Sequence, residues 1–265
     1  MSDGTRVIVS GSGKMGRAIL EAVEAADGMT PVGVIEGFAE AETLVLSSGT
    51  SVPMAAEPAE AFAAWPADVV IDFTNAAWTP RVADAAVEHG VRPVIGTSGI
   101  SDAYVASLAE RCRERKLGGL VAANFALGAV LLMHMAKIAA PFFDAAEIIE
   151  LHHDQKVDAP SGTAIATARG MAQARGRPFA RNVPESETIA AARAAEIEGV
   201  TLHAVRLPGL VAHQEVIFGG QGQTLTIRHD SIGRDSFMPG ILLAVREVMR
   251  REELVVGLDA LIGLA

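Results

Sequence analysis

The sequence predicts an α/β protein, in which a Rossmann-like doubly wound parallel sheet is followed by a second α+β domain with a mixed, largely antiparallel sheet. Three observations support this fold class. In the first half of the chain, short β-branched runs alternate with amphipathic stretches, as in parallel sheets with right-handed helical crossovers. A glycine-rich loop joins the first predicted strand to the first predicted helix. Beyond residue 124 the alternation ends, and later strands are separated by Gly/Pro turns.

The elements of the first half follow from their hydrophobic period. Residues 6–10 (RVIVS) form the first predicted strand, and residues 14–26 form a helix whose apolar residues recur at helical spacing. Residues 78–90 and 101–116 are predicted helices, the second opened by Ser101 as an N-cap. The other predicted strands of the parallel sheet are residues 31–36, 67–73, 92–97 and 119–124.

The second half begins with a long apolar helix, predicted at about residues 128–143. A strand at 146–152 and a helix that starts near Ser161 follow it. The polar stretch 181–199 has little apolar periodicity and is predicted to be a mobile surface connection. The last predicted elements are strands at 200–207, 214–219 and 223–229 and a helix at 236–253.

Composition argues against several classes of protein. The formal net charge of −10 disfavours a nucleic-acid partner. Cys112 is the single cysteine, so neither an intrachain disulfide nor a cysteine-rich metal site is possible, which suits a cytoplasmic protein. The first residues do not resemble a signal peptide. The most apolar stretch is interrupted by His134 and Lys137, so it indicates a buried helix and no membrane span.

The glycine loop GSGKMG is the first candidate binding element. In this motif Gly11 permits a tight turn, Gly13 lets a pyrophosphate approach the backbone, and Gly16 lets helix and strand pack closely. A glycine turn without any ligand is the alternative. Glu36 favours a dinucleotide, because an acid about 20 residues beyond the loop can bind the ribose hydroxyls. The strand ends GTSG and AANF are predicted to lie at the same edge of the sheet, although either stretch alone also fits an ordinary turn.

The stretch ELHHDQKVDAPSGTA gathers the most titratable chemistry. His152 and His153 are neighbours on a predicted strand and point to opposite faces, so they do not chelate one zinc ion. Lys156 follows closely, and the hydroxyls of Ser161 and Thr163 lie at a helix start with free N–H groups. Together these groups form a receptor for a carboxylate with a proton donor beside it. The alternatives are a core histidine and simple helix capping. With the dinucleotide loop, the pattern predicts reduction of a small carboxylate.

These residues resemble the 4-hydroxy-tetrahydrodipicolinate reductases of bacterial lysine and diaminopimelate synthesis. The stretch quoted above looks like that family's signature, and the similarity extends over nearly the whole chain. The resemblance implies NAD(P)H-dependent reduction of a small dicarboxylate, with hydride delivered to C4 of its dehydrated ring. It also implies a homotetramer assembled through the second sheet. The last helix is expected to return to the first domain, which gives a dinucleotide domain of residues 1–125 and 236–265 and a substrate and oligomerisation domain of residues 126–235. The further matching stretches are GKMGR, DFT, GTSG, AANF, RLPGLVAHQEVIFGG and RHDSIGRDSFMPG.

Roles carried over by position are expectations of the resemblance. His152 matches the proton donor and acceptor, and Lys156 matches the proton donor. Besides Lys156, the positions expected to bind substrate are His153, Ser161, Gly162 and Thr163. The positions expected to contact the cofactor are Gly11, Ser12, Gly13, Lys14, Met15, Gly16, Glu36, Gly96, Thr97, Ser98, Ala122, Ala123, Asn124 and Phe125. Many members carry one more residue in the glycine loop, which puts the contacts at Ser12 and Gly13 in doubt.

Glu36 also predicts the cofactor preference. Its carboxylate can accept hydrogen bonds from both ribose hydroxyls of NADH, whereas the 2′-phosphate of NADPH meets like charge. The next residues are Gly37 and Phe38, so no arginine follows to neutralise that phosphate. Lys14 is the nearby cation expected to help, and Arg17 is a more distant one. We therefore expect both cofactors to be used, with NADH preferred, and no metal.

Two other functions remain compatible with the residues. One is a related dehydrogenase that acts on another small carboxylate. The other is a catalytically silent dinucleotide-sensing protein, which would be expected to have lost His152 or Lys156, and both are present.

Overall fold

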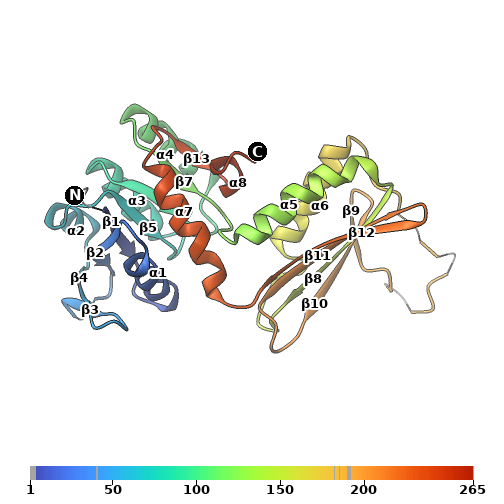
Figure 1. Ribbon diagram of the computed structural model, residues 1–265, viewed down its shortest axis with the longest axis horizontal. Coiled ribbons are helices and arrows are strands. Elements are labelled where there is room, and N and C mark those ends of the chain that lie inside the picture. The colour runs from blue at the N-terminus through green and yellow to red at the C-terminus, as the bar shows by residue number, and fades with distance from the viewer. Residues whose placement is uncertain (1–3, 40, 182, 185, 190–191, 265) are drawn as a thin grey trace. The chain divides into compact units, whose positions relative to one another are not determined.

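The computed structural model describes residues 4–39, 41–181, 183–184, 186–189 and 192–264. The chain divides into two compact units. Unit 1 is Met1–Ala126 with Arg234–Ala265, and unit 2 is Leu127–Gly233. In Figure 1 the ribbon is coloured along the chain, from blue at the N-terminus to red at the C-terminus.

Unit 1 contains an eight-stranded sheet of order β13-β7-β6-β5-β1-β2-β4-β3. All its neighbouring strands pair in parallel except β3 and β4, which are antiparallel. The predicted doubly wound parallel sheet is therefore confirmed. Its strands are β1 (Thr5–Ser10), β2 (Met29–Ile35), β3 (Thr43–Val45), β4 (Ser51–Ala55), β5 (Val69–Asp72), β6 (Arg92–Ile95), β7 (Gly119–Val121) and β13 (Leu254–Val256).

The helices of unit 1 form two layers. The chain moves from β1 to β2 in one direction along the sheet and from β5 to β7 in the other. Right-handed crossovers therefore place the helices of the two halves on opposite faces. One layer is α1 (Lys14–Ala25), α7 (Met238–Val248) and α8 (Leu258–Leu261), and the other is α2 (Pro58–Ala64), α3 (Thr79–Glu88) and α4 (Asp102–Glu114). The direction reverses at β1 and β5, where open α/β sheets bind their ligands.

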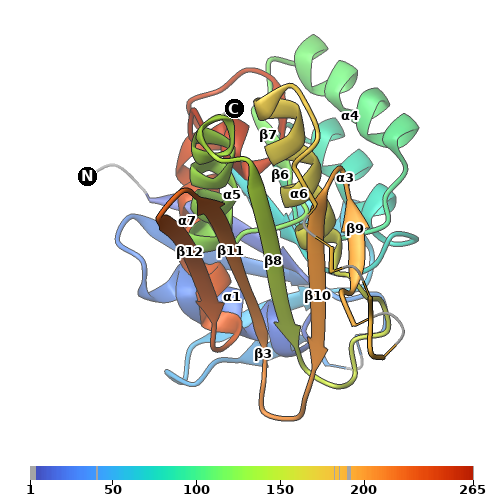
Figure 2. The same ribbon diagram turned by 90° about the vertical axis from the view of Figure 1, so that its right-hand side faces the viewer.

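Unit 2 is a five-stranded sheet of order β12-β11-β8-β10-β9 with two helices. Only β8 and β10 are parallel neighbours, so the sheet is mixed and largely antiparallel, as predicted. In Figure 2 the five strands lie side by side, with both helices on one face of the sheet. The elements are α5 (Leu127–Ala139), η1 (Ala140–Phe142), β8 (Ala145–His152), α6 (Gly162–Arg175), β9 (Ala195–Ile197), β10 (Val200–Arg206), β11 (Ala212–Gly220) and β12 (Gln223–Ser231), and η2 (Arg234–Phe237) leads back into unit 1.

Strand β8 alternates between its two faces. Ala146, Ile148 and Glu150 are buried, while the residues between them are half-buried. Ile148 packs in the core of unit 2 with Val216 and the helical residue Leu132. Because side chains two apart share a face, His152 emerges on the same face as Glu150.

Several short elements were not predicted. Strands β3, β4 and β13 and helices α2 and α8 are too short to show a clear period. The stretch 181–199, predicted to be a mobile surface connection, contains the short strand β9, which pairs antiparallel with β10 and was not predicted. Four residues of this connection, at positions 182, 185, 190 and 191, lie outside the described residues. Among the helices that the structure describes, none is long and apolar enough to cross a membrane.

Candidate active site

The glycine loop leads from β1 into α1. Gly11 has φ +94, and a Cβ at Gly16 would lie 1.9 Å from the carbonyl oxygen of Gly11, so only glycine fits at these two positions. At Gly13, by contrast, an added Cβ would meet no atom of the described chain within 4 Å. Gly13 precedes the first turn of α1, and no side chain of a described residue caps that turn. The exposed N–H groups and the open space suit a pyrophosphate.

Glu36 follows β2 directly and is held by the glycine loop. Its Oε2 accepts hydrogen bonds from the backbone N–H and the hydroxyl of Ser12, both at 2.8 Å. It also lines a cavity of about 540 Å³, which we call the adenosine cavity. The lining residues are Gly11, Ile35, Glu36, Gly37, Phe38, Thr74, Asn75, Ala77, Trp78 and Arg81. The cavity lies within unit 1, at the reversal point between β1 and β5.

Sequence reasoning did not identify the positively charged side chain that lines this cavity. We expected Lys14, or more distantly Arg17, to be the positive group near Glu36, but the described residues that line the cavity include neither. Arg81 of α3 lines it instead, and the expectation that Lys14 or Arg17 is the cation near a bound phosphate stays a prediction. Arg81 lies in a separate predicted helix, and only the order of the strands brings the start of α3 beside the end of β2. The reversal of strand order at β1 was the one signal that could have indicated it.

Asp72, at the end of β5, joins the loops of the binding edge. It is buried, and its carboxylate accepts hydrogen bonds from the hydroxyls of Thr74 at 2.7 Å, Thr97 at 2.9 Å and Thr79. The side chain of Thr97 is therefore engaged with Asp72, which leaves its backbone to contact a cofactor. Sequence reasoning assigned no role to Asp72, although it belongs to the DFT motif.

The stretches after β6 and β7 are shaped by packing. A Cβ at Gly96 would lie 2.1 Å from the ring of Phe73, whose centroid is 5.0 Å from that of Phe125. Ala122 and Phe125 are buried, while Ser98 and Ala123 are exposed. The side-chain oxygen of Asn124 accepts a hydrogen bond from the N–H of Ala126 at 2.9 Å. Because β1, β5, β6 and β7 are neighbours, their following loops lie along one edge of the sheet, where the expected cofactor positions are brought together.

In unit 2, Glu150 is the centre of a buried cluster. Its side chain is 0% exposed. The ring Nδ1 of His152 lies 2.5 Å from one carboxylate oxygen, and the guanidinium of Arg206 binds both oxygens at 2.8 and 2.9 Å. The backbone N–H of Ser161 donates to the same carboxylate at 3.1 Å. We call Glu150, His152, Arg206 and Ser161 the Glu150 cluster. Sequence reasoning missed Glu150 and Arg206. The i, i+2 spacing of Glu150 and His152 on one strand was an available signal for the first.

The cluster sets the charge of His152. Burial acts to raise the pKa of Glu150, but hydrogen bonds from Arg206 and His152 outweigh it and hold that pKa below its ordinary value. Burial lowers the pKa of His152, and the charges of Lys156 and Arg206 add to this, while Glu150 opposes it. His152 is therefore mainly neutral at pH 7, with its Nδ1–H directed to Glu150 and a lone pair on Nε2.

Lys156 and His153 lie in the turn after β8. The strand ends at His152, so the expected alternation of faces does not extend to His153, which is exposed. The Lys156 ammonium lies 2.7 Å from the carboxylate of Asp158 and its side chain is 22% exposed. Its charge adds to the lowering of the pKa of His152, the other expected catalytic group.

The start of α6 completes the site in unit 2. Ser161 is the N-cap, and its hydroxyl oxygen accepts from the N–H of Ala164 at 3.2 Å. The capping alternative is thus correct for Ser161. The N–H groups of Gly162 and Thr163 and the Thr163 hydroxyl donate to no acceptor among the described residues. These three donors are therefore available to a ligand. An added Cβ at Gly162 would meet no described atom within 4 Å. This helix start can receive a carboxylate.

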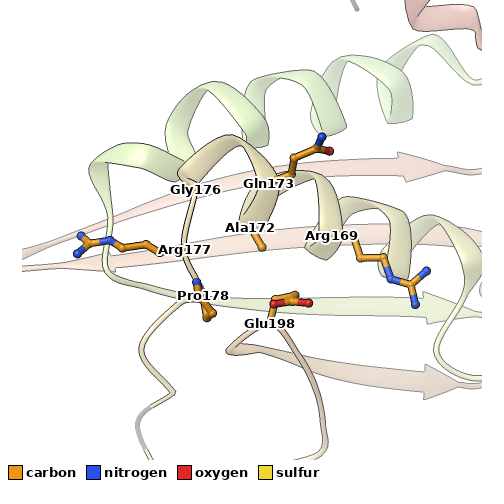
Figure 3. A pocket seen from close by; sticks show the side chains of 7 residues that line it. All are labelled: Arg169, Ala172, Gln173, Gly176, Arg177, Pro178 and Glu198. Carbon is orange, nitrogen blue, oxygen red and sulfur yellow. The ribbon is translucent and has the colours of Figure 1, made fainter.

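Unit 2 contains a cavity of about 390 Å³ at the C-terminal end of α6. Figure 3 shows that the side chains of Arg169 and Arg177, two of its lining residues, point toward opposite ends and do not converge on one ligand. The part of the chain that the structure describes also contains no group of three or more His, Cys, Asp or Glu side chains able to hold a metal ion.

Known proteins resemble the chain over both units. Residues 5–125 match the family model described as "Dihydrodipicolinate reductase, N-terminus", and residues 128–262 match "Dihydrodipicolinate reductase, C-terminus". The chain is similar to proteins named 4-hydroxy-tetrahydrodipicolinate reductase. It is 43% identical to one from Dehalococcoides mccartyi strain BAV1 over 261 residues, with 98% of both chains covered. It is 49% identical to one from Streptococcus pneumoniae strain Hungary19A-6 over 258 residues, with 97% and 99% covered.

A solved structure agrees with these relatives. It is described as a dipicolinate-bound dihydrodipicolinate reductase from Paenisporosarcina sp. TG-14, and it superposes with a TM-score of 0.87 at 40% identity, covering 97% of this chain and 99% of that one. An amine dehydrogenase from Mycobacterium smegmatis, with a TM-score of 0.68 at 14% identity and coverage of 97% and 96%, is similar in fold alone.

Proposed function

The chain belongs to the dihydrodipicolinate reductase family, and from this premise we propose how its residues carry out the reaction. Its activity is that of an NAD(P)H-dependent oxidoreductase, the reduction of 4-hydroxy-tetrahydrodipicolinate in lysine and diaminopimelate biosynthesis. Unit 1 binds the dinucleotide and unit 2 binds the dicarboxylate. The observation that carries the residue roles is the Glu150 cluster, with Lys156 and the start of α6 beside it. The family resemblance also supports a homotetramer built through the β8–β12 sheet and a cytoplasmic location.

The cofactor fits the residues of unit 1. The first turn of α1, with the open space at Gly13, would hold the pyrophosphate, and Glu36 would bind the adenine ribose in the adenosine cavity. The remaining contacts come from Gly96 to Ser98 and from Ala122 to Phe125, mainly through backbone groups. When bound, the nicotinamide supplies the hydride.

The substrate fits the start of α6. One carboxylate accepts hydrogen bonds from the N–H groups of Gly162 and Thr163 and from the Thr163 hydroxyl, and Lys156 adds a positive charge. The Ser161 hydroxyl oxygen caps the helix and holds this start in place. His153, exposed after the strand end, is available to the second carboxylate.

Proton transfer follows from the charges of the site. Hydride addition at C4 places an electron pair in the conjugated ring, and one proton must neutralise it. The Lys156 ammonium donates that proton. Neutral His152 can take up a proton from solvent at Nε2, because the Glu150 carboxylate stabilises the imidazolium, and can pass it on to replace the proton that Lys156 has given up. Glu150 and Arg206 are positioning residues, since they act through His152.

The reaction itself is tested by following NADH oxidation with the freshly formed product of dihydrodipicolinate synthase. Turnover that depends on this substrate separates the proposed reductase from a silent sensing protein. Absence of turnover here, together with turnover on another small carboxylate, would support the related dehydrogenase instead.

Replacing Thr163 by valine tests the carboxylate receptor. The variant keeps the shape but removes one donor from a charged oxygen, and such hydrogen bonds contribute about 1.5–3 kcal/mol. We expect pyridine-2,6-dicarboxylate to bind about 10–100-fold more weakly, measured as its competitive inhibition constant. Thr43→Val, at an exposed position of strand β3 in unit 1, is the matched control and should bind the analogue like the wild type. Equal affinity in Thr163→Val and the wild type would show that the receptor lies elsewhere.

The cofactor preference is tested by comparing kcat/KM for NADH and NADPH at fixed substrate and ionic strength. We expect both to be used and NADH to be several-fold better, because Glu36 favours ribose hydroxyls and repels a 2′-phosphate. Glu36→Gln should reduce the difference in kcat/KM between NADH and NADPH. A clear preference of the wild type for NADPH would contradict the role given to Glu36.

A further inference from the structure

We propose that Arg81 is the residue through which the adenosine cavity accepts a 2′-phosphate, and that Glu57 limits this acceptance by pairing with Arg81. The proposal rests on the proposed binding of a dinucleotide in unit 1. It adds a residue that sets cofactor specificity, 45 positions beyond Glu36 in the sequence.

The first support is the shared cavity. Glu36 and Arg81 line the same space of about 540 Å³, together with Phe38, Asn75 and Trp78. Glu36 is already tied to Ser12 at the glycine loop, so the position of the ribose next to it is constrained. A phosphate on that ribose would be repelled by Glu36 and attracted by the guanidinium of the same cavity.

The second support is the stacking of Arg81 on the indole ring of Trp78. Its guanidinium carbon lies 4.8 Å from the ring centroid of Trp78. That ring is held in place, because its Nε1 donates to the Ser10 hydroxyl at 3.2 Å. A Cβ at Gly37 would come within 2.9 Å of the ring, so the residue after Glu36 must be small for Trp78 to lie there. The indole thus keeps the guanidinium near the cavity while leaving its N–H groups available.

The third support is that Arg81 forms only a weak, exposed ion pair with Glu57. Arg81 Nη2 lies 2.8 Å from Glu57 Oε2, and the two side chains are 56% and 53% exposed. Exposed ion pairs of this kind contribute little to stability, because solvent screens them. A phosphate dianion offers the guanidinium two parallel hydrogen bonds and a higher charge, so it competes well with one carboxylate.

The test uses adenosine fragments, so that it does not depend on turnover. Binding of adenosine 2′,5′-bisphosphate and of AMP, which lacks the 2′-phosphate, is measured by calorimetry on the full chain. We expect Arg81→Ala to weaken the bisphosphate about tenfold or more and AMP less than about threefold, as expected for loss of a charge-assisted pair. Glu57→Gln should tighten the bisphosphate and leave AMP unchanged, and Arg81→Lys should give an intermediate result.

Arg113→Ala is the matched control, since Arg113 is also an exposed arginine of unit 1 paired with a glutamate, Glu110. It should bind both fragments like the wild type, and thermal melting checks that all variants fold. Equal weakening of both fragments in Arg81→Ala would overturn the proposal, because Arg81 would then support the cavity as a whole. The proposal would also be overturned if Arg81→Ala left the ratio of the affinities for the bisphosphate and for AMP unchanged. Failure of the wild type to bind either fragment would overturn it as well. If the reductase assay failed but Arg81→Ala still weakened the bisphosphate selectively, only the proposed reaction would be contradicted.

Discussion

Replacing Lys156 by alanine is expected to lower kcat by about 10²–10⁴-fold, the range that a positioned general acid contributes. Lys156 lies beside His152, and its charge already acts on that ring. Because the same ammonium is also proposed to bind a substrate carboxylate, KM should rise as well. Steady-state kinetics with NADH measures both effects.

The controls separate chemistry from charge. Lys156→Arg keeps the positive charge but donates a proton far less readily, since arginine remains protonated. It should restore part of the substrate affinity and little of kcat. Lys116→Ala removes an exposed lysine of unit 1 and should behave as the wild type. Near wild-type kcat and KM in Lys156→Ala would remove this residue from the mechanism.

Glu150→Gln is expected to have the second large effect, on stability and on kcat together. The carboxylate is fully buried and satisfies Arg206, His152 and the N–H of Ser161. The Arg206 guanidinium then keeps the backbone carbonyls of Val205 and Asp158 as acceptors but loses its charged partner. Breaking a buried ion pair costs up to about 3–5 kcal/mol of unfolding free energy. We expect kcat to fall by at least about tenfold, because the imidazolium of His152 loses its stabilising partner. Denaturant unfolding and kinetics measure the two losses separately.

The pH profile separates a positioning role for Glu150 from a purely structural one. If neutral His152 is the active form, kcat/KM falls as pH decreases through the pKa of His152. Glu150 acts to raise that pKa, so its removal should move the acid limb of the profile to lower pH. Glu147→Gln is the matched control, because Glu147 is on the same strand and pairs with Arg193 and His203 instead. An acid limb that stays in place in Glu150→Gln would show that His152 is not the group that titrates.

Much of the local structure of the candidate site was predictable from the sequence, because it depends on neighbouring residues. The glycine loop, the capped start of α6 and the neighbours His152 and Lys156 each depend on residues within a few positions of one another. Their backbone geometry follows from residue type, such as the positive φ of Gly11 and the cap formed by Ser161. The partners that tune these groups were not predictable in the same way.

By itself, the sequence determined the alternation of strands and helices, the parallel sheet of unit 1 and the stretches to which the proposed chemistry is assigned, because hydrophobic period and turn residues act over short distances. Tertiary structure alone decided which distant side chains meet. Arg206 reaches Glu150 across 56 positions because β10 pairs in parallel with β8, with Arg206 opposite His152. Arg81 lines the adenosine cavity because the strand order places β5 and its following helix beside β1. Both arrangements depend on strand order and register, which arise from the packing of the whole sheet and from no local pattern.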